Sequence, residues 1–390
     1  ALIEQAGVEA LPLGPGVEAS CARLNISKQS FVSEVAKDGA FYFKNAVLPF
    51  LEATTEVLWR ASQDADVIIT STLGVSGRIV AEARNLPHVY VKLQPGLVYS
   101  PYDPPVMKEF PSFRPLPQTE DDVAFNKREI AMMHAARASS MASILNGVRA
   151  GYGLAPIDAD PINQIPSADR LALGLFSNLL APIGCENDVF HVVGPSLYDK
   201  AEVFAGDEKQ KLLGFLDAGA PPIVFTLGSL VSNLSSSFHT ESFEAASKLE
   251  KRMIFLTGGA ALDIPSRDDV LVLDYAPYSM LLPAAESIVH HGGVGTAQQA
   301  LASACPQVIV PHLGDQHDNA ARVARLGAGV VIRPEDYNAG SACDALRHIR
   351  DTRPKASLAA IHIKSEQSRQ KISALIARLL DTASPQRRRA

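Results

Sequence analysis

The sequence has little cysteine and no long apolar run, and each scarcity argues against a class of protein. Its four cysteines, Cys21, Cys185, Cys305 and Cys343, lie far apart and include no C-x-x-C pair. This spacing favours free thiols over a disulfide framework or a zinc site. No apolar run approaches the roughly 18 residues that a membrane-spanning helix needs, and no signal peptide is recognisable. We therefore expect a cytoplasmic protein, with contact to a membrane surface and the oligomeric state left open.

Positive charge is also scarce. The chain has 36 Lys and Arg against 42 Asp and Glu, which gives a formal net charge of −6. Proteins that bind nucleic acid need clustered basic residues to meet the phosphates, so nucleic acid is not expected as a partner. The one basic run, Arg387–Arg389, follows Pro385 at the end of the chain, and we interpret it as a tail.

Apolar runs typical of strands alternate with helical patterns along most of the chain. Asp66–Thr70 and His88–Leu93 are such runs, and later ones are FHVVGP, PIVFTLGS, MIFLTGG, VLVLDYA, SIVHHGG, PQVIVPHL and GVVIR. Runs that are apolar on both faces and separated by helices predict parallel sheets covered on both sides. A chain of 390 residues is too long to fold around one ordinary hydrophobic core. We therefore predict an α/β fold with two doubly wound, Rossmann-like domains.

The expected domains are residues 1–194 and 195–364, followed by a C-terminal segment, 365–390, whose helix could pack back on the first domain. A pattern of one or two amphipathic helices covers residues 355–380. The first residues read as a helix ending at Gly7 and running into a short strand, as in the middle of an α/β domain. We therefore expect at least one β-α-β unit, about 30 residues or more, to precede residue 1.

Proline is concentrated between Pro95 and Glu120, where the chain has seven of them. Such density blocks regular structure and predicts a long loop, which in a compact domain is usually functional or disordered. Four aromatic residues in it are candidate acceptor contacts: Tyr99, Tyr102, Phe110 and Phe113. A surface loop with its aromatic side chains tucked inwards is the alternative. A helix is predicted from Val123 to Ala150.

Four predicted strands of the second half end in polar or glycine-rich sequence. These ends are Gly228-Ser229, Thr257-Gly258-Gly259, His290-His291-Gly292-Gly293 and His312–Gln316. The carboxyl ends of parallel strands lie on one edge of a sheet, and ligands bind in the crevice there. The sequence therefore predicts one ligand site built from all four ends.

The stretch HHGGVGT joins a strand to a helix, which is a pattern suited to phosphate. Glycine lets the backbone approach a ligand closely, and a helix N-terminus offers unpaired N–H groups. A purely structural turn is the alternative. The Asp315-Gln316 pair supplies acceptors and an amide that suit sugar hydroxyls, although Asp315 could equally be an N-cap. A metal site from His312, His317 and neighbouring aspartates lacks the spacing of known zinc motifs.

The stretch from Tyr275 to Leu326 resembles the donor-binding signature of the GT-B, family 1 glycosyltransferases. This group includes plant, macrolide and sterol glycosyltransferases, and the likeness is greatest to rhamnolipid rhamnosyltransferases and sterol-type relatives. It is clear from PIVFTLGS onward and covers the first half only in outline. The resemblance implies an inverting, metal-independent transfer of a hexose or deoxyhexose from a UDP- or dTDP-sugar to a hydroxyl of a hydrophobic small molecule or lipid. The nucleotide sugar is a co-substrate, and no other cofactor is expected.

The resemblance also implies roles for individual residues. Tyr275, followed by Ala276, stands where relatives stack on the base; His290 stands at the diphosphate contact; Asp315 and Gln316 meet the sugar. Gln298 stands where many relatives have a glutamate that grips the ribose hydroxyls. The remaining donor-binding candidates line the phosphate turn and its neighbouring loops: Gly228, Ser229, Thr257, Gly292, Gly293, Val294, Gly295 and Thr296.

The catalytic base is not assigned. In this family it is a His or Asp just after the first strand, which we expect to precede residue 1. Ser71 stands near the place where many plant relatives have an assisting Asp, and Tyr278 stands where Gln is common. Two alternatives stay open: a sugar-nucleotide epimerase or hydrolase with the same donor cleft, and a non-catalytic nucleotide-sugar binder.

Overall fold

A computed structural model of the chain describes residues 2–5, 7–38, 40–108, 112–163, 170–228, 237–260 and 262–382. The chain forms two compact units. The first comprises residues 1–91, 128–173 and 373–390, and the second comprises residues 92–127 and 174–372. Both units thus combine segments that are separate in sequence, whereas the predicted domains are continuous. The domain boundaries at residues 194 and 364 stay predictions.

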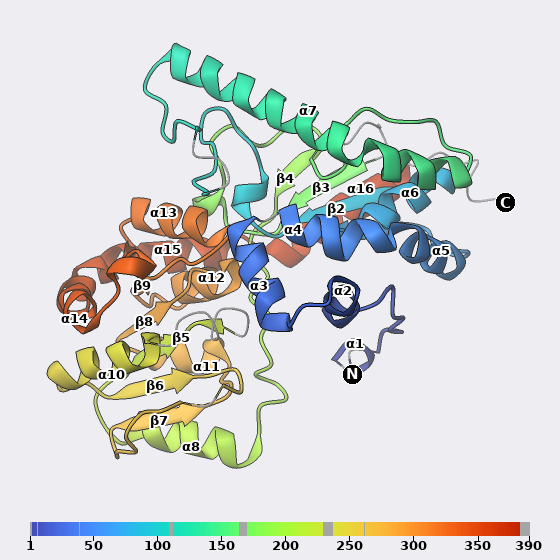
Figure 1. Cartoon of the computed structure of the whole chain (residues 1–390). Helices are drawn as coiled ribbons and strands as arrows, with labels where there is room; N and C mark the ends of the chain where they lie inside the picture. Colours follow the sequence, from blue (N-terminus) through green and yellow to red (C-terminus); the bar gives the residue numbers. More distant parts are fainter. Residues whose placement is uncertain are drawn as a thin grey trace. The chain divides into compact units, whose positions relative to one another are not determined.

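The first unit has helices around parallel strands. Its elements, some of which extend into the second unit, are α1 (Leu2–Gln5), α2 (Val17–Leu24), α3 (Lys28–Lys37), α4 (Ala40–Tyr42), the π-helical turn η1 (Phe43–Val47), η2 (Leu48–Phe50), α5 (Leu51–Ala61), β1 (Ile68–Ser71), α6 (Val75–Ala83), β2 (His88–Lys92), α7 (Glu120–Gly151), β3 (Arg170–Gly174) and α16 (Ser368–Thr382) (Figure 1). The short strand expected after Gly7 is absent, because residues 8–16 are in neither helix nor strand. Strand β3 was not predicted.

The core of the first unit forms where its helices pack together. Strands β1 and β2 run parallel, with Ile68 opposite His88, and helix α5 packs on α6. Leu51, Ile79 and Leu145 from α5, α6 and α7 meet in one buried cluster. The strand order is β1-β2-β3-β4, with β4 spanning Phe190–Val192.

The second unit is built on a six-stranded sheet. Its elements are η3 (Pro95–Leu97), η4 (Asn178–Leu180), β4, α8 (Gly206–Asp217), β5 (Ile223–Thr226), α10 (Phe238–Lys248), β6 (Met253–Leu256), β7 (Val270–Leu273), α11 (Tyr278–Leu281), η5 (Leu282–Ala284), β8 (Ser287–His290), α12 (Val294–Ala302), β9 (Gln307–Ile309), α13 (Gln316–Arg325), β10 (Gly329–Val331), η6 (Pro334–Asp336), α14 (Ala339–His348), η7 (Ile349–Thr352) and α15 (Arg353–Ser365).

The six strands are arranged in the order β10-β9-β8-β5-β6-β7, and every neighbouring pair is parallel. Strand β5 is buried throughout, because it is covered on both faces. On one face Phe225 packs with residues of α10 and α14, and on the other Val224 packs with residues of α8, α11 and α12. The predicted α/β fold with two parallel sheets is therefore confirmed, and the chain order places helices on both faces of this sheet (Figure 1).

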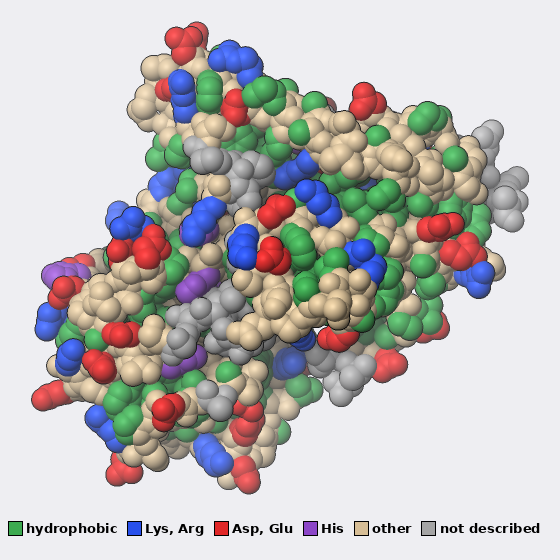
Figure 2. Space-filling view, in the orientation of Figure 1, with side chains coloured by type: hydrophobic (Ala, Val, Ile, Leu, Met, Phe, Trp, Pro, Cys, Tyr) green, Lys and Arg blue, Asp and Glu red, His purple; other side chains and the backbone are tan. Residues whose placement is uncertain are grey.

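The predicted helix at 123–150 is confirmed as α7, and the C-terminal pattern forms the two helices α15 and α16. Between η3 and α7 the described residues form no further helix or strand, as the proline content predicts. No helix among the described residues is long and apolar enough to span a membrane. On the face shown in Figure 2, acidic and basic side chains are interspersed.

Candidate functional site

The predicted strand ends do lie on one edge of the six-stranded sheet. In the register of the parallel strands, Thr226 of β5 is opposite Leu256 of β6 and His290 of β8. His290 is in turn opposite Ile309 of β9. The segments that follow these four strands therefore leave the sheet at the same level and on the same side, which is where an open α/β sheet binds its ligands.

His290 faces the interior of the sheet and not this edge. Its side chain is 0% exposed. Nδ1 accepts a hydrogen bond from the N–H of Gly292 (3.1 Å), so the ring proton is on Nε2, which donates to Oε1 of Gln307 (2.9 Å). Nε2 of Gln307 in turn donates a hydrogen bond to the carbonyl of Ala297 (3.3 Å). Because both ring nitrogens are used inside the protein, the predicted diphosphate contact for His290 is wrong in this geometry.

The next residue, His291, follows strand β8 and begins the glycine turn. Its ring lies beside two glycines: a Cβ atom at Gly228 would be 2.8 Å from Cε1, and one at Gly293 would be 2.6 Å from Nε2. Its Nδ1 is buried and has no hydrogen-bond partner. Burial, followed by the nearby His312, lowers the pKa of His291 to about 4. The ring is therefore neutral at pH 7 and has an unused polar atom in the glycine turn.

The glycine turn is shaped by the close packing of its backbone. Gly292 has φ +89°, and a Cβ there would lie 2.9 Å from Cγ2 of Ile309 and 3.0 Å from the carbonyl oxygen of Gln316. Gly293 is the N-cap of α12 and provides no side-chain cap. The first-turn N–H groups of α12 are therefore not occupied by a capping side chain and carry the positive end of the helix dipole. An anion bound at this turn would meet these groups directly.

The rest of the predicted phosphate turn lies in the first turn of α12. Val294 is half-buried and Gly295 is exposed, with no atom within 4 Å of a notional Cβ. Thr296 is half-buried, and its hydroxyl lies 3.5 Å from that of Tyr278. Burial raises the pKa of Tyr278, so its hydroxyl stays protonated. These residues leave space and hydroxyl groups at the start of the helix.

Asp315 and Gln316 open helix α13 beside this turn. Asp315 is at the N-cap, and its Oδ2 accepts a hydrogen bond from Nδ2 of Asn319 (2.8 Å). The same nitrogen donates to the carbonyl of Gly292 (3.0 Å), which ties α13 to the glycine turn. Oε1 of Gln316 accepts the N–H groups of His312 (2.8 Å) and Leu313 (3.1 Å). The Gln316 oxygen thus shapes the preceding loop, and its amide nitrogen is the atom that could meet a sugar hydroxyl.

Two further histidines lie near the start of α13. His312 and His317 are half-buried, and Nε2 of each is buried without a hydrogen-bond partner. Burial, followed by the charges of His317 and Lys108, lowers the pKa of His312 to about 4. Burial and then Lys108 also lower the pKa of His317. Among the described residues no cluster of three or more His, Cys, Asp or Glu side chains could hold a metal ion.

Gln298 does not lie where a ribose contact would require it. It is 3% exposed, and its Oε1 accepts the N–H of Ser177 (2.8 Å). The predicted role of Gln298 is therefore wrong in this geometry. Its neighbour Gln299 points to another side of α12, where its Nε2 donates to the carbonyl of Leu197 (3.4 Å).

Tyr275 lies in the same neighbourhood as Gln299. Its hydroxyl accepts the N–H of Lys200 (3.0 Å), and the Lys200 ammonium is 5.5 Å from the ring centroid. The ring is 38% exposed, so part of its surface remains accessible. Ala276, in contrast, is buried, with 1% of its surface exposed. The accessible ring of Tyr275 is consistent with stacking against a base, which remains a prediction.

Thr257 follows strand β6 and is hydrogen bonded to Asp274, which follows strand β7. Its hydroxyl donates to Oδ1 of Asp274 (2.9 Å) and accepts the N–H of Gly259 (3.1 Å). With both functions of the hydroxyl used, and the residue only 3% exposed, the predicted donor contact is not supported. Ser229 lies outside the described residues, whereas Gly228 has φ +66° and is the second residue after β5.

The four aromatic residues predicted to contact an acceptor do not share one environment. Phe113 is buried, Tyr99 is half-buried and Tyr102 is 48% exposed. Tyr102 lines a surface groove together with residues 117–121 and Lys127. Phe110 lies outside the described residues. Acceptor contact thus remains a prediction for Tyr99 and Tyr102, while Phe113 fits the alternative of an aromatic side chain tucked inwards.

Sequence reasoning missed His291, Gln299 and Gln307. The first two are each one position after the residue that was chosen. No signal in the sequence separates His291 from His290, because a fully buried strand shows no alternation from which the direction of its last side chain could be read. Gln307 could be recognised only from the strand register, which places it opposite Ile288, two residues before His290.

The chain resembles known proteins over most of its length. Residues 256–380 match the family described as Erythromycin biosynthesis protein CIII-like, C-terminal domain. The chain is 29% identical to Glycosyltransferase GtfE of Amycolatopsis orientalis over 283 residues, 70% of this chain and 64% of that protein, so it spans less than two thirds of GtfE. It is 26% identical to the vancomycin aglycone glucosyltransferase of the same organism over 336 residues, 84% of this chain and 75% of that protein.

A solved structure shows the same fold. The glycosyltransferase VinC, in complex with dTDP, superposes with a TM-score of 0.63 at 20% sequence identity, covering 97% of this chain and 89% of that one. Such low identity shows the fold alone, and the named sequence relatives are glycosyltransferases. The chain is therefore similar to the family 1 glycosyltransferases with the GT-B fold.

Proposed function

We propose that this protein transfers a hexose or deoxyhexose from a UDP- or dTDP-sugar to a hydroxyl group of a hydrophobic small molecule. The observation that carries the proposal is the glycine turn of residues 291–293, where the His291 ring, with a buried nitrogen that has no hydrogen-bond partner, lies beside the uncapped start of α12. The named relatives include an aglycone glucosyltransferase, and the VinC structure contains dTDP.

The diphosphate would bind at this turn. Its negative charge grows as the bond to the sugar breaks, and the first-turn N–H groups of α12 are aimed at it from a fixed position. Neutral His291 would add an N–H donor. Each such donor lowers the barrier by about 2–4 kcal/mol. These groups supply the electrostatic stabilisation that a divalent ion provides in other transferases, which supports a metal-independent reaction.

The sugar and nucleoside would extend from the turn in opposite directions. Asp315, the amide nitrogen of Gln316 and the rings of His312 and His317 are the polar groups at the start of α13 that would meet the sugar hydroxyls. On the other side, Gln299 would meet the ribose and Tyr275 the base, since both contact the segment 197–200. Inversion follows if a base activates the acceptor hydroxyl for direct attack on the anomeric carbon.

A donor and acceptor matrix tests the proposal. The purified protein is incubated with UDP- and dTDP-sugars and with hydroxylated aromatic or steroid acceptors, with and without EDTA. We expect nucleoside diphosphate release only when donor and acceptor are both present, an unchanged rate with EDTA, and a product of inverted anomeric configuration by NMR. Release without acceptor would instead indicate a hydrolase or epimerase, and no release and no nucleotide binding would overturn the proposal.

A further inference from the structure

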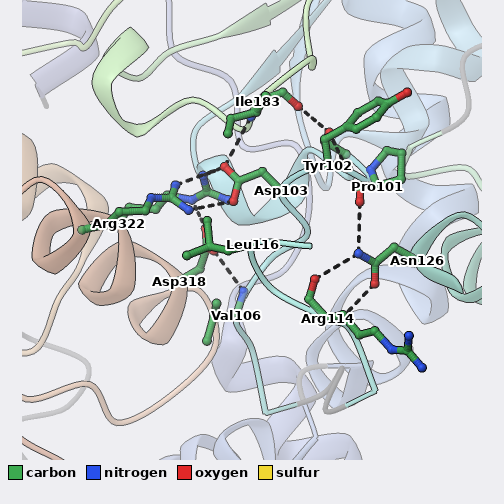
Figure 3. Close-up of polar contacts among 12 residues, drawn as sticks. Pro101, Tyr102, Asp103, Val106, Arg114, Leu116, Asn126, Ile183, Asp318 and Arg322 are labelled. Atoms are coloured by element: carbon green, nitrogen blue, oxygen red, sulfur yellow. Dashed lines mark hydrogen bonds and ion pairs between the residues drawn. The ribbon is translucent and has the colours of Figure 1, made fainter. Parts of the chain in front are cut away.

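Asp103, within the proline-rich segment, is held by Arg322 and Arg325 of helix α13. Figure 3 shows Asp103 facing Arg322. Its Oδ2 accepts a hydrogen bond from Nη1 of Arg322 (2.8 Å). Arg325 adds Nη1 to Oδ1 (2.9 Å) and Nη2 to Oδ2 (3.1 Å). Burial by itself raises the pKa of Asp103, but the hydrogen bonds from Arg325 and the charge of Arg322 outweigh it and leave the pKa below its ordinary value. The carboxylate is therefore ionised at neutral pH.

Asp318 ties the same segment to α13 from the other side. Its Oδ2 accepts Nε of Arg322 (2.7 Å), and its Oδ1 accepts the backbone N–H of Val106 (3.0 Å). The segment also approaches Asp318 at Gly96, where a Cβ atom would lie only 3.2 Å from Oδ2. Gly96 thus permits a backbone contact that a larger residue would hinder. Figure 3 shows Asp318 between Val106 and Arg322.

The three central groups of this cluster are almost entirely removed from water. Asp103, Asp318 and Arg322 are 2%, 1% and 2% exposed. With Arg325 the cluster has two positive and two negative charges, so it is balanced. A buried ion pair is inefficient at stabilising a fold compared with apolar packing of the same volume, and its best attested use is to fix one arrangement of the chain. The cluster is suited to that use here, because prolines 101, 104 and 105 have no N–H groups with which to anchor the segment.

We propose that Asp103, Asp318 and Arg322 are positioning residues, which clamp residues 95–108 onto α13 and so place the acceptor-contacting segment relative to the sugar-binding start of that helix. This proposal deepens the proposed function and rests on it for the roles of the two parts. Tyr99 and Tyr102 are carried by the clamped segment, and Asp315 and Gln316 lie at the start of α13. The clamp thus fixes the acceptor-contacting segment, residues 95–108, to the unit that binds the donor.

The test compares two buried carboxylates of the same unit. Asp103→Asn weakens the clamp, and Glu286→Gln is the matched control, since Glu286 also accepts from two basic side chains, Lys251 (2.9 Å) and Arg350 (3.0 Å). Glu286 precedes β8 and is therefore at the opposite edge of the sheet from the site. Hydrogen–deuterium exchange of residues 95–108, the Kd of UDP and dTDP, and the acceptor KM are measured for both variants.

We expect Asp103→Asn to increase deuterium uptake in residues 95–108 and to raise the acceptor KM about ten-fold, as expected for the loss of one charge-assisted hydrogen bond. The Kd of the nucleotides should stay within about two-fold, because the glycine turn is not part of the clamp. Glu286→Gln should change neither the deuterium uptake of residues 95–108 nor the acceptor KM, even if it lowers the melting temperature. Arg322→Lys, which keeps the charge but loses the two-pronged geometry, should fall between wild type and Asp103→Asn.

Gly96→Ala serves as a second variant if Asp103→Asn does not fold, and it should shift uptake and acceptor KM in the same direction. Unchanged uptake in residues 95–108 overturns the clamp, whatever the activity. Increased uptake with an unchanged acceptor KM overturns its positioning role. If the wild-type protein forms no product, the proposed function fails by itself, and the exchange data still decide whether the clamp exists.

Discussion

His290 and His291 are consecutive, yet their rings are nearly perpendicular, with an interplanar angle of 87° and centroids 6.3 Å apart. His290 ends strand β8 and is enclosed in the sheet, with both nitrogens hydrogen bonded. His291 begins the glycine turn and has an unpartnered Nδ1. The two rings therefore differ in environment: both nitrogens of the first are used inside the protein, whereas the second has a buried nitrogen without a hydrogen-bond partner.

Replacing each histidine by alanine tests this difference. We expect His291→Ala to weaken binding of UDP or dTDP about ten-fold or more, because it removes a donor to a charged group, with little loss of stability. His290→Ala should lower the free energy of unfolding by about 1–3 kcal/mol, because it leaves Oε1 of Gln307 and the N–H of Gly292 without these partners. Calorimetric titration and denaturant unfolding measure the two effects. Equal loss of affinity in a fully folded His290→Ala protein would contradict this assignment.

The free energy of unfolding should fall as the pH is lowered below the ordinary pKa of histidine, about 6.5. Burial, followed by the charges of Arg78 and Arg170, lowers the pKa of His88 to about 3, and burial lowers that of His290 to about 3. Between these values and the unfolded pKa of about 6.5, the unfolded chain binds more protons than the folded one, so acid favours unfolding.

Each of these two residues should thus cost about 1.4 kcal/mol of stability per pH unit below about pH 6.5. The carboxylates with lowered pKa values, such as Asp103, act in a separate window, since their contribution is lost only below about pH 4. Denaturant midpoints measured between pH 7 and 5 test this prediction. A His88→Asn variant should show a shallower dependence on pH, and an identical slope would count against it.

Gly293 should be sensitive to the addition of a single methyl group. A Cβ there would lie 2.6 Å from Nε2 of His291, so the ring must move. We expect Gly293→Ala to weaken nucleotide binding about as much as His291→Ala, roughly ten-fold. Gly214→Ala is the control, because Gly214 is in helix α8 with no atom within 4 Å of a notional Cβ. It should stabilise the protein by up to about 1 kcal/mol and leave binding unchanged, and an equal loss of binding in both variants would argue against a displaced ring.

The sequence was sufficient to predict the sheet and the edge that carries the site. Parallel strands buried on both faces leave continuous apolar runs, and the glycine and polar residues that follow them mark their carboxyl ends. It was not sufficient to choose between His290 and His291, or between Gln298 and Gln299. A fully buried strand has no alternation from which to read the direction of its last side chain, and adjacent helix residues point about 100° apart.

Contacts between distant segments were beyond sequence reasoning for a different reason. Asp103 and Arg322 are 219 positions apart, and neither residue type nor spacing indicates that they meet. The proline content predicted a loop, but not where the loop is fastened. Strand β3 was missed because RLALG is short and follows a polar stretch, so that only its pairing in the sheet identifies it.

Arg149 and Glu82 form a two-pronged ion pair inside the first unit. Nη1 and Nη2 of Arg149 each lie 2.8 Å from a Glu82 oxygen, and Nε donates to the carbonyl of Ala155 (2.9 Å). Arg149 is 3% exposed, and hydrogen bonds from it lower the pKa of Glu82. Arg149→Met should lower the free energy of unfolding of this unit by about 1–3 kcal/mol, less than for a fully buried pair because Glu82 is partly exposed.

The only tryptophan of the chain, Trp59, is in helix α5 of the same unit, so its fluorescence reports the unfolding of that unit. Lys37→Ala is the comparison, because it removes an exposed pair with Glu34 and should change stability by no more than about 0.5 kcal/mol. We expect the Trp59 transition in urea to shift to lower concentration for Arg149→Met only. The difference should shrink as acid protonates Glu82, whose pKa is lowered by Arg149, because the protein with Arg149 then loses the pair that Arg149→Met already lacks. Superimposable transitions for the two variants at pH 7 would show that this ion pair does not stabilise the unit.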